Sequence, residues 1–367
     1  MDVGSYQFKS LESKYGGFLA PAFEITVGAT KIDSSKIPVS QLSIDIDAGT
    51  SAGGCQFTIE SQYDYETSKW AGGILDTIQA GAKLSVSGGY VKKEELFYGF
   101  VDDFSIDYSA SSSPRIVVHG IDAKGYLMSA KDRKYMSEKA TTAVVKDILN
   151  ECVTHSFAKS ITVGTLTNFN AQLIQEEIDD YKFLCFLAEM YNMCFFIING
   201  EIIFDSLMSK TKPIIRLSLG TSLLNFSKTV SLKQQVGKVM VFGIDPKTKK
   251  PIKGEATDTS IGGAGKESGD YSGGFNKVIE KEVNLFVYTP EECTKLAQAR
   301  FDARAFSFVK GKGKCIGMPE LIPGRYVELA GFDEKSSDTY FITKVTHEYT
   351  PSEGYYTTFE VKGAKSK

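Results

Sequence analysis

The sequence has few histidines, a single tryptophan and no closely paired cysteines. Three of its 367 residues are histidines, and the one tryptophan is Trp70. No CxxC pair occurs among the cysteines, which are Cys55, Cys152, Cys185, Cys194, Cys293 and Cys315. We therefore expect reduced, mostly buried thiols in a protein made in a cytoplasm, rather than a disulfide framework.

Targeting segments and strong charge are also missing. The N-terminal residues do not combine a basic start with an apolar run, so no signal peptide is expected. No stretch of 18 apolar residues occurs, so no membrane span is expected. The net charge is −3 without a basic cluster, which argues against sequence-specific nucleic-acid binding.

Glycine and aromatic residues are abundant. The chain has 34 glycines and 12% aromatic residues, a composition typical of a protein built from strands and turns. The length predicts two to four domains. We predict a mainly β fold with an α+β insert, in which two tube-like β-barrel domains flank a small helix-hairpin domain.

The first predicted barrel domain spans residues 1–129. Residues 41–47 alternate, with Leu42, Ile44 and Ile46 on one face. Such alternation is typical of a half-buried strand. A short helix is expected over 68–79, and the expected strands are 22–31, 41–47, 53–60, 83–90, 95–108 and 115–121. The polar face of the 41–47 strand carries Ser43, Asp45 and Asp47.

The predicted α+β domain spans residues 130–210. Thr142 is expected to cap a helix over 143–153, and Asp179 or Asp180 a helix over 180–192. Asn199-Gly200 lies between two apolar runs, which predicts a β-hairpin.

The second predicted barrel domain spans residues 211–367. Thr289 and Pro290 predict a helix start. The polar, glycine-rich stretch 245–277 is expected to be a flexible loop. Strands are expected over 214–219, 223–230, 238–244, 278–283, 310–316, 325–329, 340–349 and 355–361. Because the first and third regions are both β bodies with one helix, two barrels of similar design are expected.

The residue patterns do not predict catalytic, metal or cofactor chemistry. His119, His155 and His347 are far apart in sequence, and surface or hydrogen-bonded strand positions explain them. The stretch GGAGKESG at 262–269 fails the phosphate-loop pattern, because Ser260 and Glu267 stand where a glycine and a hydroxyl residue are needed. A solvent-exposed strand face explains the acidic pair 102–103, and a helix cap explains the pair 179–180. We therefore expect a protein that is not an enzyme.

Five segments in order resemble the late control protein D family, the baseplate hub proteins of contractile phage tails. The chain is also similar to the hub part of type VI secretion spike proteins. Asp122 and Leu127 lie in the first segment, and Phe183, Leu184, Leu187 and Ala188 in the third. The segments are IVVHGIDAKGYLM (116–128), TTAVVKDILNEC (141–152), DDYKFLCFLAEMYNMCFFIINGEIIFD (179–205), LIPGRYVELAGF (321–332) and YFITKVTHEYTPSEGYYTTFEV (340–361).

The resemblance implies a homotrimeric structural hub that adapts a six-fold tail tube to a three-fold spike. Its implied partners are other copies of itself, the tail tube protein, a separate spike protein and other baseplate proteins. It would be assembled in the bacterial cytoplasm as part of a phage virion tail, a tailocin or an injection particle. A polar face such as that of Ser43, Asp45 and Asp47 would line the lumen; the alternative is that it only faces solvent.

Two other functions stay open at this point. A tail-associated cell-wall hydrolase would need two carboxylates or a dyad in a cleft. A carbohydrate-binding β adhesin would need an exposed aromatic platform, which Trp70, predicted on a helix, does not supply.

Overall fold

The computed structural model describes most of the chain. The described residues are 5–32, 37–60, 62–109, 111–129, 141–166, 175, 178–208, 210–261, 266–267, 277–284 and 287–366. Strands predominate and a small α+β unit lies beside two β bodies, so the predicted fold class is confirmed. None of the described helices is long and apolar enough to cross a membrane.

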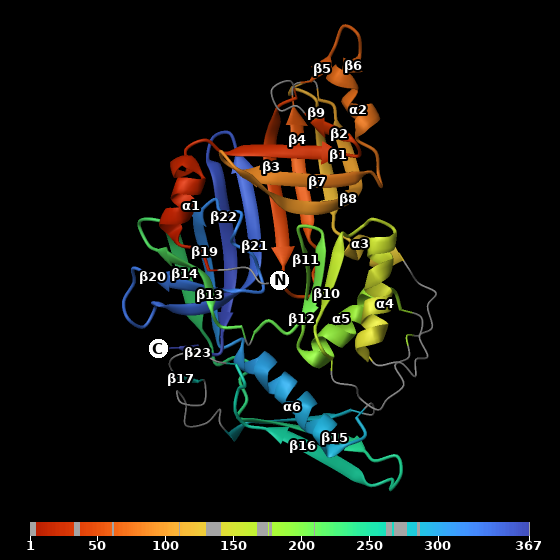
Figure 1. The fold of residues 1–367 in the computed structure, drawn as a ribbon, viewed down its shortest axis with the longest axis vertical. Helices are drawn as coiled ribbons and strands as arrows, with labels where there is room; N and C mark the ends of the chain where they lie inside the picture. Colours follow the sequence, from red (N-terminus) through yellow and green to blue (C-terminus); the bar gives the residue numbers. More distant parts are fainter. Residues whose placement is uncertain are drawn as a thin grey trace.

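The first barrel is an antiparallel sheet folded over its own core. Its strands follow the order β3-β4-β9-β8-β7-β1-β2. In Figure 1, β3 and β4 run steeply, and β1 and β7 cross in front of them. Side chains from both layers, such as Ile44, Phe57 and Val86, are fully buried between them. The strands are β1 (Ala22–Val27), β2 (Thr30–Ile32), β3 (Val39–Asp47), β4 (Gly54–Glu60), β7 (Lys83–Gly89), β8 (Lys93–Asp107) and β9 (Arg115–Ile121).

The second barrel has a similar body. The order is β14-β19-β22-β21, with β20 on β21 and β13 parallel to β20. The N-terminal helix α1 (Phe8–Lys14) bridges the barrels, because Lys14 Nζ lies 2.6 Å from Glu94 and 2.8 Å from Glu320. The strands are β13 (Pro213–Ser218), β14 (Leu223–Val230), β19 (Val309–Ile316), β20 (Tyr326–Ala330), β21 (Asp338–Thr350) and β22 (Gly354–Gly363).

The two barrels share one sheet. Strand β21 pairs with β20 at its start and with β3 over its second half, where Thr346 lies opposite Asp45. Within the described residues this makes a single 13-stranded sheet that runs through both barrels. The sequence predicted two barrels but not that backbone hydrogen bonds join them.

The first small unit places a three-stranded sheet between helices and barrel. Phe195 and Phe204 pack towards the helices, whereas Phe196 and Ile203 belong to the barrel core. Its elements are α3 (Lys124–Ser129), α4 (Thr141–Thr154), α5 (Asp180–Tyr191), β10 (Ser160–Val163), β11 (Cys194–Ile198) and β12 (Glu201–Asp205).

Two of the three local predictions for this unit are confirmed. Asn199 and Gly200 both have positive φ and connect β11 to β12, as an Asn-Gly hairpin requires. Asp179 caps α5, since its Oδ1 accepts from the Lys182 N–H at 2.7 Å. The Thr142 cap is wrong: Thr142 lies inside α4, and its hydroxyl accepts from the N–H of Leu166 instead.

A second small unit was not predicted. Helix α6 (Pro290–Ala305) covers a sheet of β15 (Lys238–Ile244), β16 (Pro251–Ala256) and β18 (Ile279–Val283). The helix start at Thr289 is confirmed, with a capping box to Glu292.

The flexible loop predicted over 245–277 is wrong for β16. That strand is ordered by α6, because Gly254 lies against the helix backbone at Thr294, where a side chain would not fit. Residues 262–265 and 268–276 lie outside the described residues, and 266–267 form β17, which pairs with β23 (Lys365–Ser366).

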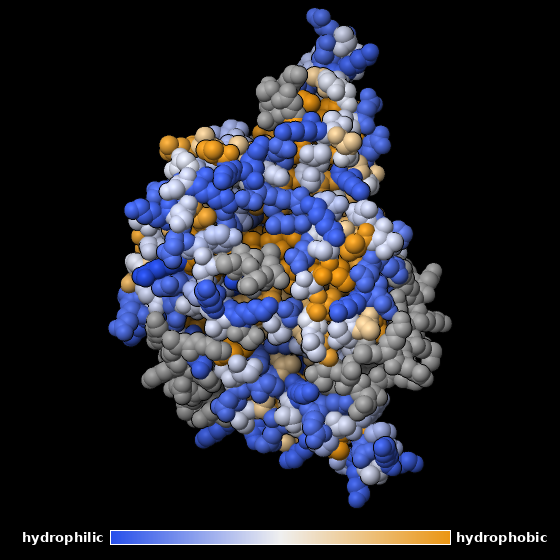
Figure 2. All heavy atoms as spheres, in the orientation of Figure 1, coloured by the Kyte–Doolittle hydropathy of each residue, from blue (hydrophilic) through white to orange (hydrophobic). Residues whose placement is uncertain are grey.

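An arm projects beyond the first barrel. It carries β5 (Tyr63–Asp64), β6 (Lys69–Trp70) and the single turn α2 (Ile74–Thr77). The helix predicted over 68–79 is therefore wrong for its first half, where Gly72 and Gly73 have positive φ. Figure 1 shows this arm at one end and the β15–β16 hairpin at the other, and both tips are hydrophilic in Figure 2. Hydrophobic side chains on the face drawn there gather near the centre.

A buried lysine joins the small unit to the first barrel. Lys124 is fully buried, and its Nζ donates to the carbonyls of Ser51 and Phe195, both at 2.6 Å. It also lies 4.5 Å from the Phe195 ring centroid. Burial lowers the pKa of Lys124, while the neighbouring carboxylate of Asp122 opposes that shift. The ammonium thus ties the β3–β4 loop to β11.

Replacing this lysine should loosen the small unit. In Lys124→Met two buried carbonyls lose their donor, so we expect the free energy of unfolding to fall by about 3 kcal/mol. Urea unfolding followed by circular dichroism measures it, with Lys335→Met at an exposed position as the matched control. Equal stability of both variants would show that the ammonium is not a structural tie.

Candidate functional site

The two halves of the long sheet repeat each other in register. Strands β3-β4-β9-β8 correspond to β14-β19-β22-β21. One cross-strand row of the first half is Leu42, Phe57, Val118 and Phe104. The matching row of the second half is Phe226, Gly313, Phe359 and Val345. The prediction of two barrels of similar design is therefore confirmed for these strands.

The irregularities repeat as well. A bulge between Val39 and Gln41 of β3 has its counterpart between Leu223 and Asn225 of β14. A second bulge, between Val101 and Asp103 of β8, has its counterpart between Ile342 and Lys344 of β21. In each half, the extra residue of each bulge precedes the residue of the compared row on the same strand by two positions. Bulges are specific features of a strand pair, so their agreement shows one strand architecture used twice.

One face of the eight joined strands is polar. One row, in order across five strands, is Ser227, Lys312, Glu360, Lys344 and Asp47. Another row is Ser43, Gln56, His119 and Asp103. We call this side of the eight strands, with its polar side chains, the polar face. Positive and negative groups alternate along the first row, whereas Lys310 lies opposite Lys362 in the row beside it.

The predicted residues Ser43, Asp45 and Asp47 lie near the middle of the polar face. All three are half-buried. Asp45 Oδ1 accepts from the Thr346 hydroxyl at 2.6 Å and lies 3.1 Å from Lys344 Nζ. These contacts cross the junction of the two halves, so Asp45 also holds β3 to β21. That this face lines a lumen stays a prediction.

The polar face ends in two unpaired strand edges. Within the part of the chain that the structure describes, β14 pairs with β19 and has otherwise only a single bridge, from its first residue Leu223 to Leu219, and residues 102–107 of β8 pair with β9 alone. Apolar side chains are exposed beside them: Val230 is 45% and Tyr108 59% exposed. Long open edges with exposed apolar groups are normally covered in native proteins.

The three histidines lie in three different surroundings. His119 pairs with Asp103 on the polar face, Nδ1 to Oδ1 at 2.7 Å, and His155 packs on Tyr126. His347 is buried beneath the junction, opposite Ile44 of β3, with its Nδ1 2.9 Å from the Tyr355 hydroxyl. Among the described residues, no group of three or more His, Cys, Asp or Glu has the geometry to hold a metal ion.

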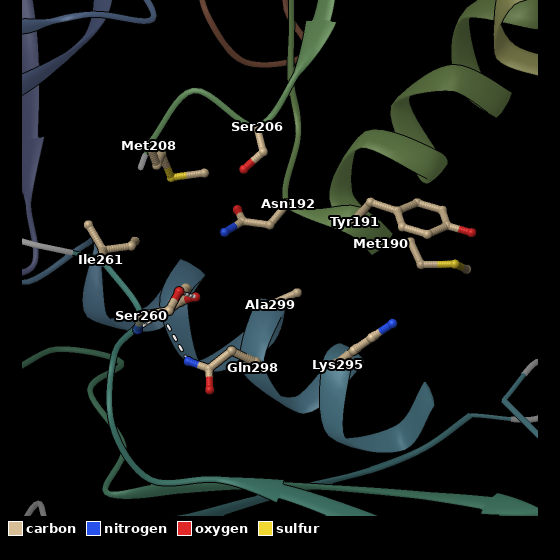
Figure 3. Close-up of a pocket in the computed structure, with 11 residues that line it drawn as sticks. Met190, Tyr191, Asn192, Ser206, Met208, Ser260, Ile261, Lys295, Gln298 and Ala299 are labelled. Carbon is tan, nitrogen blue, oxygen red and sulfur yellow. Dashed lines mark hydrogen bonds between the residues drawn. The ribbon is translucent and has the colours of Figure 1, made fainter. Parts of the chain in front are cut away.

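A pocket of about 340 Å³ lies between α5, the end of β12 and α6. Figure 3 shows Ser206 and Asn192 on one side and Lys295, Gln298 and Ala299 of α6 on the other. Its carboxylate, Asp302, accepts from the Ser260 N–H and the Thr259 hydroxyl at 2.8 and 2.9 Å, and from Gln298 at 3.2 Å. Through these donors Asp302 anchors the 259–261 segment on α6.

The thiols and remaining acidic residues have structural positions. All six cysteines are free thiols and five are buried, as predicted. Burial raises the pKa of Cys152 and Cys194 to about 12, which makes the reactive thiolate scarce. Asp180 is buried and accepts from Gln175 at 2.8 Å.

An aromatic cluster on the arm was missed because Trp70 was predicted on a helix. Trp70 lies on β6, and its Nε1 donates to the Tyr108 hydroxyl at 3.0 Å. Tyr63 packs edge-on against Tyr65, Trp70 and Tyr108, with centroids 5.2 to 5.5 Å apart. The rings of this cluster meet edge-on rather than side by side in one plane, and Tyr65 and Tyr108 are its exposed members.

Comparison with known proteins identifies the family. The sequence profile described as the Alg8 N-terminal domain matches residues 20–351. The chain belongs to the Alg8 N-terminal domain family. No curated protein matches the sequence.

Solved structures show what fold this Alg8 N-terminal domain protein has. The tail protein from Neisseria meningitidis MC58 is 12% identical, with a TM-score of 0.68 covering 94% of this chain and 97% of that one. The 43 kDa tail protein of prophage MuSo2 from Shewanella oneidensis is 18% identical, with a TM-score of 0.69 and coverage of 93% and 98%.

A third structure comes from a secretion machine. It is an E. coli type VI secretion component described as similar to the T4 bacteriophage tail proteins gp27 and gp5. It is 14% identical, with a TM-score of 0.53 and coverage of 94% and 78%. Over nearly its whole length, the Alg8 N-terminal domain protein has the fold of phage tail proteins.

The buried His347 should make the junction acid-sensitive. Burial lowers its pKa to about 3, against ~6.5 in an unfolded chain. Between these values only the unfolded state takes up the proton, so its stabilising effect is complete above pH 6.5 and is lost as the pH falls. From pH 6 to pH 4 this residue should remove about 2.5 kcal/mol from the free energy of unfolding.

Urea unfolding at a series of pH values tests this. His347→Gln should lose that part of the pH dependence, whereas His155→Gln, at an exposed position, should keep the wild-type dependence. An unchanged pH dependence in His347→Gln would contradict the assignment.

Proposed function

We propose that this chain is the structural hub of a contractile tail or injection machine, a homotrimer that adapts a six-fold tail tube to a three-fold spike. The observation that carries the proposal is the in-register repeat joined into one sheet. Each chain supplies two equivalent four-strand halves. Three copies in a closed ring therefore supply six equivalent halves, although the ring itself has three-fold symmetry.

A part of the chain that occurs only once per copy would appear three times in the ring, not six. The arm of β5, β6 and α2 lies between β4 and β7, and the second half has no such insertion between β19 and β20. The arm projects past one end of the first barrel (Figure 1). A ring of three copies thus presents six similar strand bodies, but only three arms.

The polar face suits the lining of a channel. Three copies would supply 24 strands, and at the usual strand spacing such a ring is about 37 Å across between backbones. Lysines and carboxylates alternate along one row, as Lys312, Glu360, Lys344 and Asp47, while β19 also places Lys310 and Lys314 on this polar lining. In this arrangement Ser43, Asp45 and Asp47 face the lumen.

The likeness to tail proteins supports the structural role. Both tail-protein structures are matched over almost their full length, so the whole fold is shared rather than one module. The finer resemblance to the late control protein D family rests on the five sequence segments, of which residues 179–205 form α5, β11 and β12. We assign the chain a role in assembly rather than catalysis. The partners are the tail tube, a separate spike and other baseplate proteins, with assembly in the bacterial cytoplasm.

The mass in solution tests the ring. Light scattering of the purified chain, alone and after coexpression with a tail tube protein and a spike protein, should give about 120 kDa for the hub component, three times 40.2 kDa. A chain that stays monomeric under all these conditions and binds neither tube nor spike protein would contradict the proposal.

A further inference from the structure

We infer that β14 of one copy pairs with the second half of β8 of its neighbour, in the register that β3 and β21 use inside one chain. This inference rests on the proposed ring and names the residues that close it. The partner is a second copy of this chain. The internal repeat supplies the pattern, because the chain already contains one junction of the required kind.

The internal junction has a counterpart for each of its strands. Strand β14 corresponds to β3, and residues 103–107 of β8 with the following Tyr108 correspond to 344–349 of β21. Inside the chain, β3 pairs with that part of β21. The corresponding edges of β14 and β8 have no strand partner among the described residues. Head-to-tail contacts between copies bring such edges together and close the ring.

The repeat also fixes the register. Since Val345 lies opposite Ile46 and Thr346 opposite Asp45 within the chain, the corresponding residues of two copies must lie opposite each other. The resulting pairs between copies are Phe104 with Val230, Ser105 with Thr229, Ile106 with Lys228, Asp107 with Ser227 and Tyr108 with Phe226.

The side chains suit these positions. On the core side, Phe104 meets Val230, and Tyr108 meets Phe226, so the exposed Val230 and Tyr108 become covered. Ile106 meets Lys228 between them, and the Lys228 ammonium donates to the Lys335 carbonyl at 2.6 Å, so the aliphatic part of its side chain is what faces Ile106. On the polar face, Ser105 meets Thr229 and Asp107 meets Ser227, without like charges opposite each other. Aromatic and β-branched cross-strand pairs are among the stabilising ones.

The aromatic arm extends the same contact. Tyr108 carries the cluster with Trp70 and Tyr63, while Phe226 lies 5.6 Å from the ring centroids of both Phe332 and Tyr340. Pairing Tyr108 with Phe226 brings these two clusters from different copies together. Aromatic residues near the centre of a contact surface are typical of protein–protein interfaces.

Cysteine crosslinking tests the register. Ser105→Cys with Thr229→Cys places the two thiols directly opposite, so oxidation should give covalent oligomers up to a trimer on a non-reducing gel. Ser105→Cys with Asn225→Cys is the matched control, since Asn225 is exposed but lies about 14 Å further along the strand. Each single variant reports on crosslinks to the native cysteines.

The outcomes separate register from ring. Crosslinking of 105 to 229, but not to 225, supports the inference. A trimer by light scattering whose 105–229 pair does not crosslink, or whose 105–225 pair does, overturns the register and leaves the hub proposal standing. A chain that stays monomeric with tube and spike proteins present overturns both.

A second variant pair measures the contact without cysteines. Val230→Asp puts a carboxylate opposite Phe104 of the neighbour and should weaken association of the copies at least tenfold by analytical ultracentrifugation. Leu19→Asp changes a residue that is 84% exposed, in the segment between α1 and β1 rather than on β14 or β8, and should leave association unchanged. Equal association of the two variants would overturn the inference.

Discussion

The pairing of β3 with β21 is the contact on which the architecture depends. It brings together residues 301 positions apart in the chain, such as Thr346 and Asp45. Without it, the two barrels would be separate bodies, each with an additional open edge. With it, two equivalent sets of four strands become one surface with a polar side and a core side. The long strand β21 makes this possible because it divides one edge between β20 and β3.

The small units lie beside this junction and are not part of it. Lys124 holds β11 against the loop that follows β3, and Phe196 and Ile203 complete the barrel core from the side. Helix α1 ties the barrels together a second time through Lys14, Glu94 and Glu320. The relative position of the two halves is thus set by backbone pairing and then held by side chains.

Local features of this fold could be predicted from the sequence, and long-range ones could not. Asn199-Gly200 and Thr289-Pro290 carry their own backbone preferences, so the hairpin and the helix start follow from a few residues. Strand β16 was missed because its order comes from Gly254 lying against the backbone of α6, about 40 residues later. The β3–β21 pairing leaves no local signal at all.

The sequence only suggested the repeat, because the equivalent rows of the two halves carry their large and small side chains at different positions. Where the first half has Phe57 beside Val118, the second has Gly313 beside Phe359, and the Phe359 ring fills the space that a side chain at Gly313 would take. The row is filled in both halves, but a position-by-position comparison finds a phenylalanine against a glycine.

The polar face was recognised at Ser43, Asp45 and Asp47 but not followed into the neighbouring strands, because its continuation depends on strand order.

The distance along the chain between β3 and β21 also has a consequence in time. At a synthesis rate of 5 to 20 residues per second, β3 emerges roughly 15 to 60 s before its partner. During that interval its edge is open, and Leu42, Ile44 and Ile46 form an alternating apolar run that invites pairing with other nascent chains. Formation of the junction therefore requires that translation has passed residue 349, and a chain interrupted earlier keeps an open strand edge, the feature that favours aggregation.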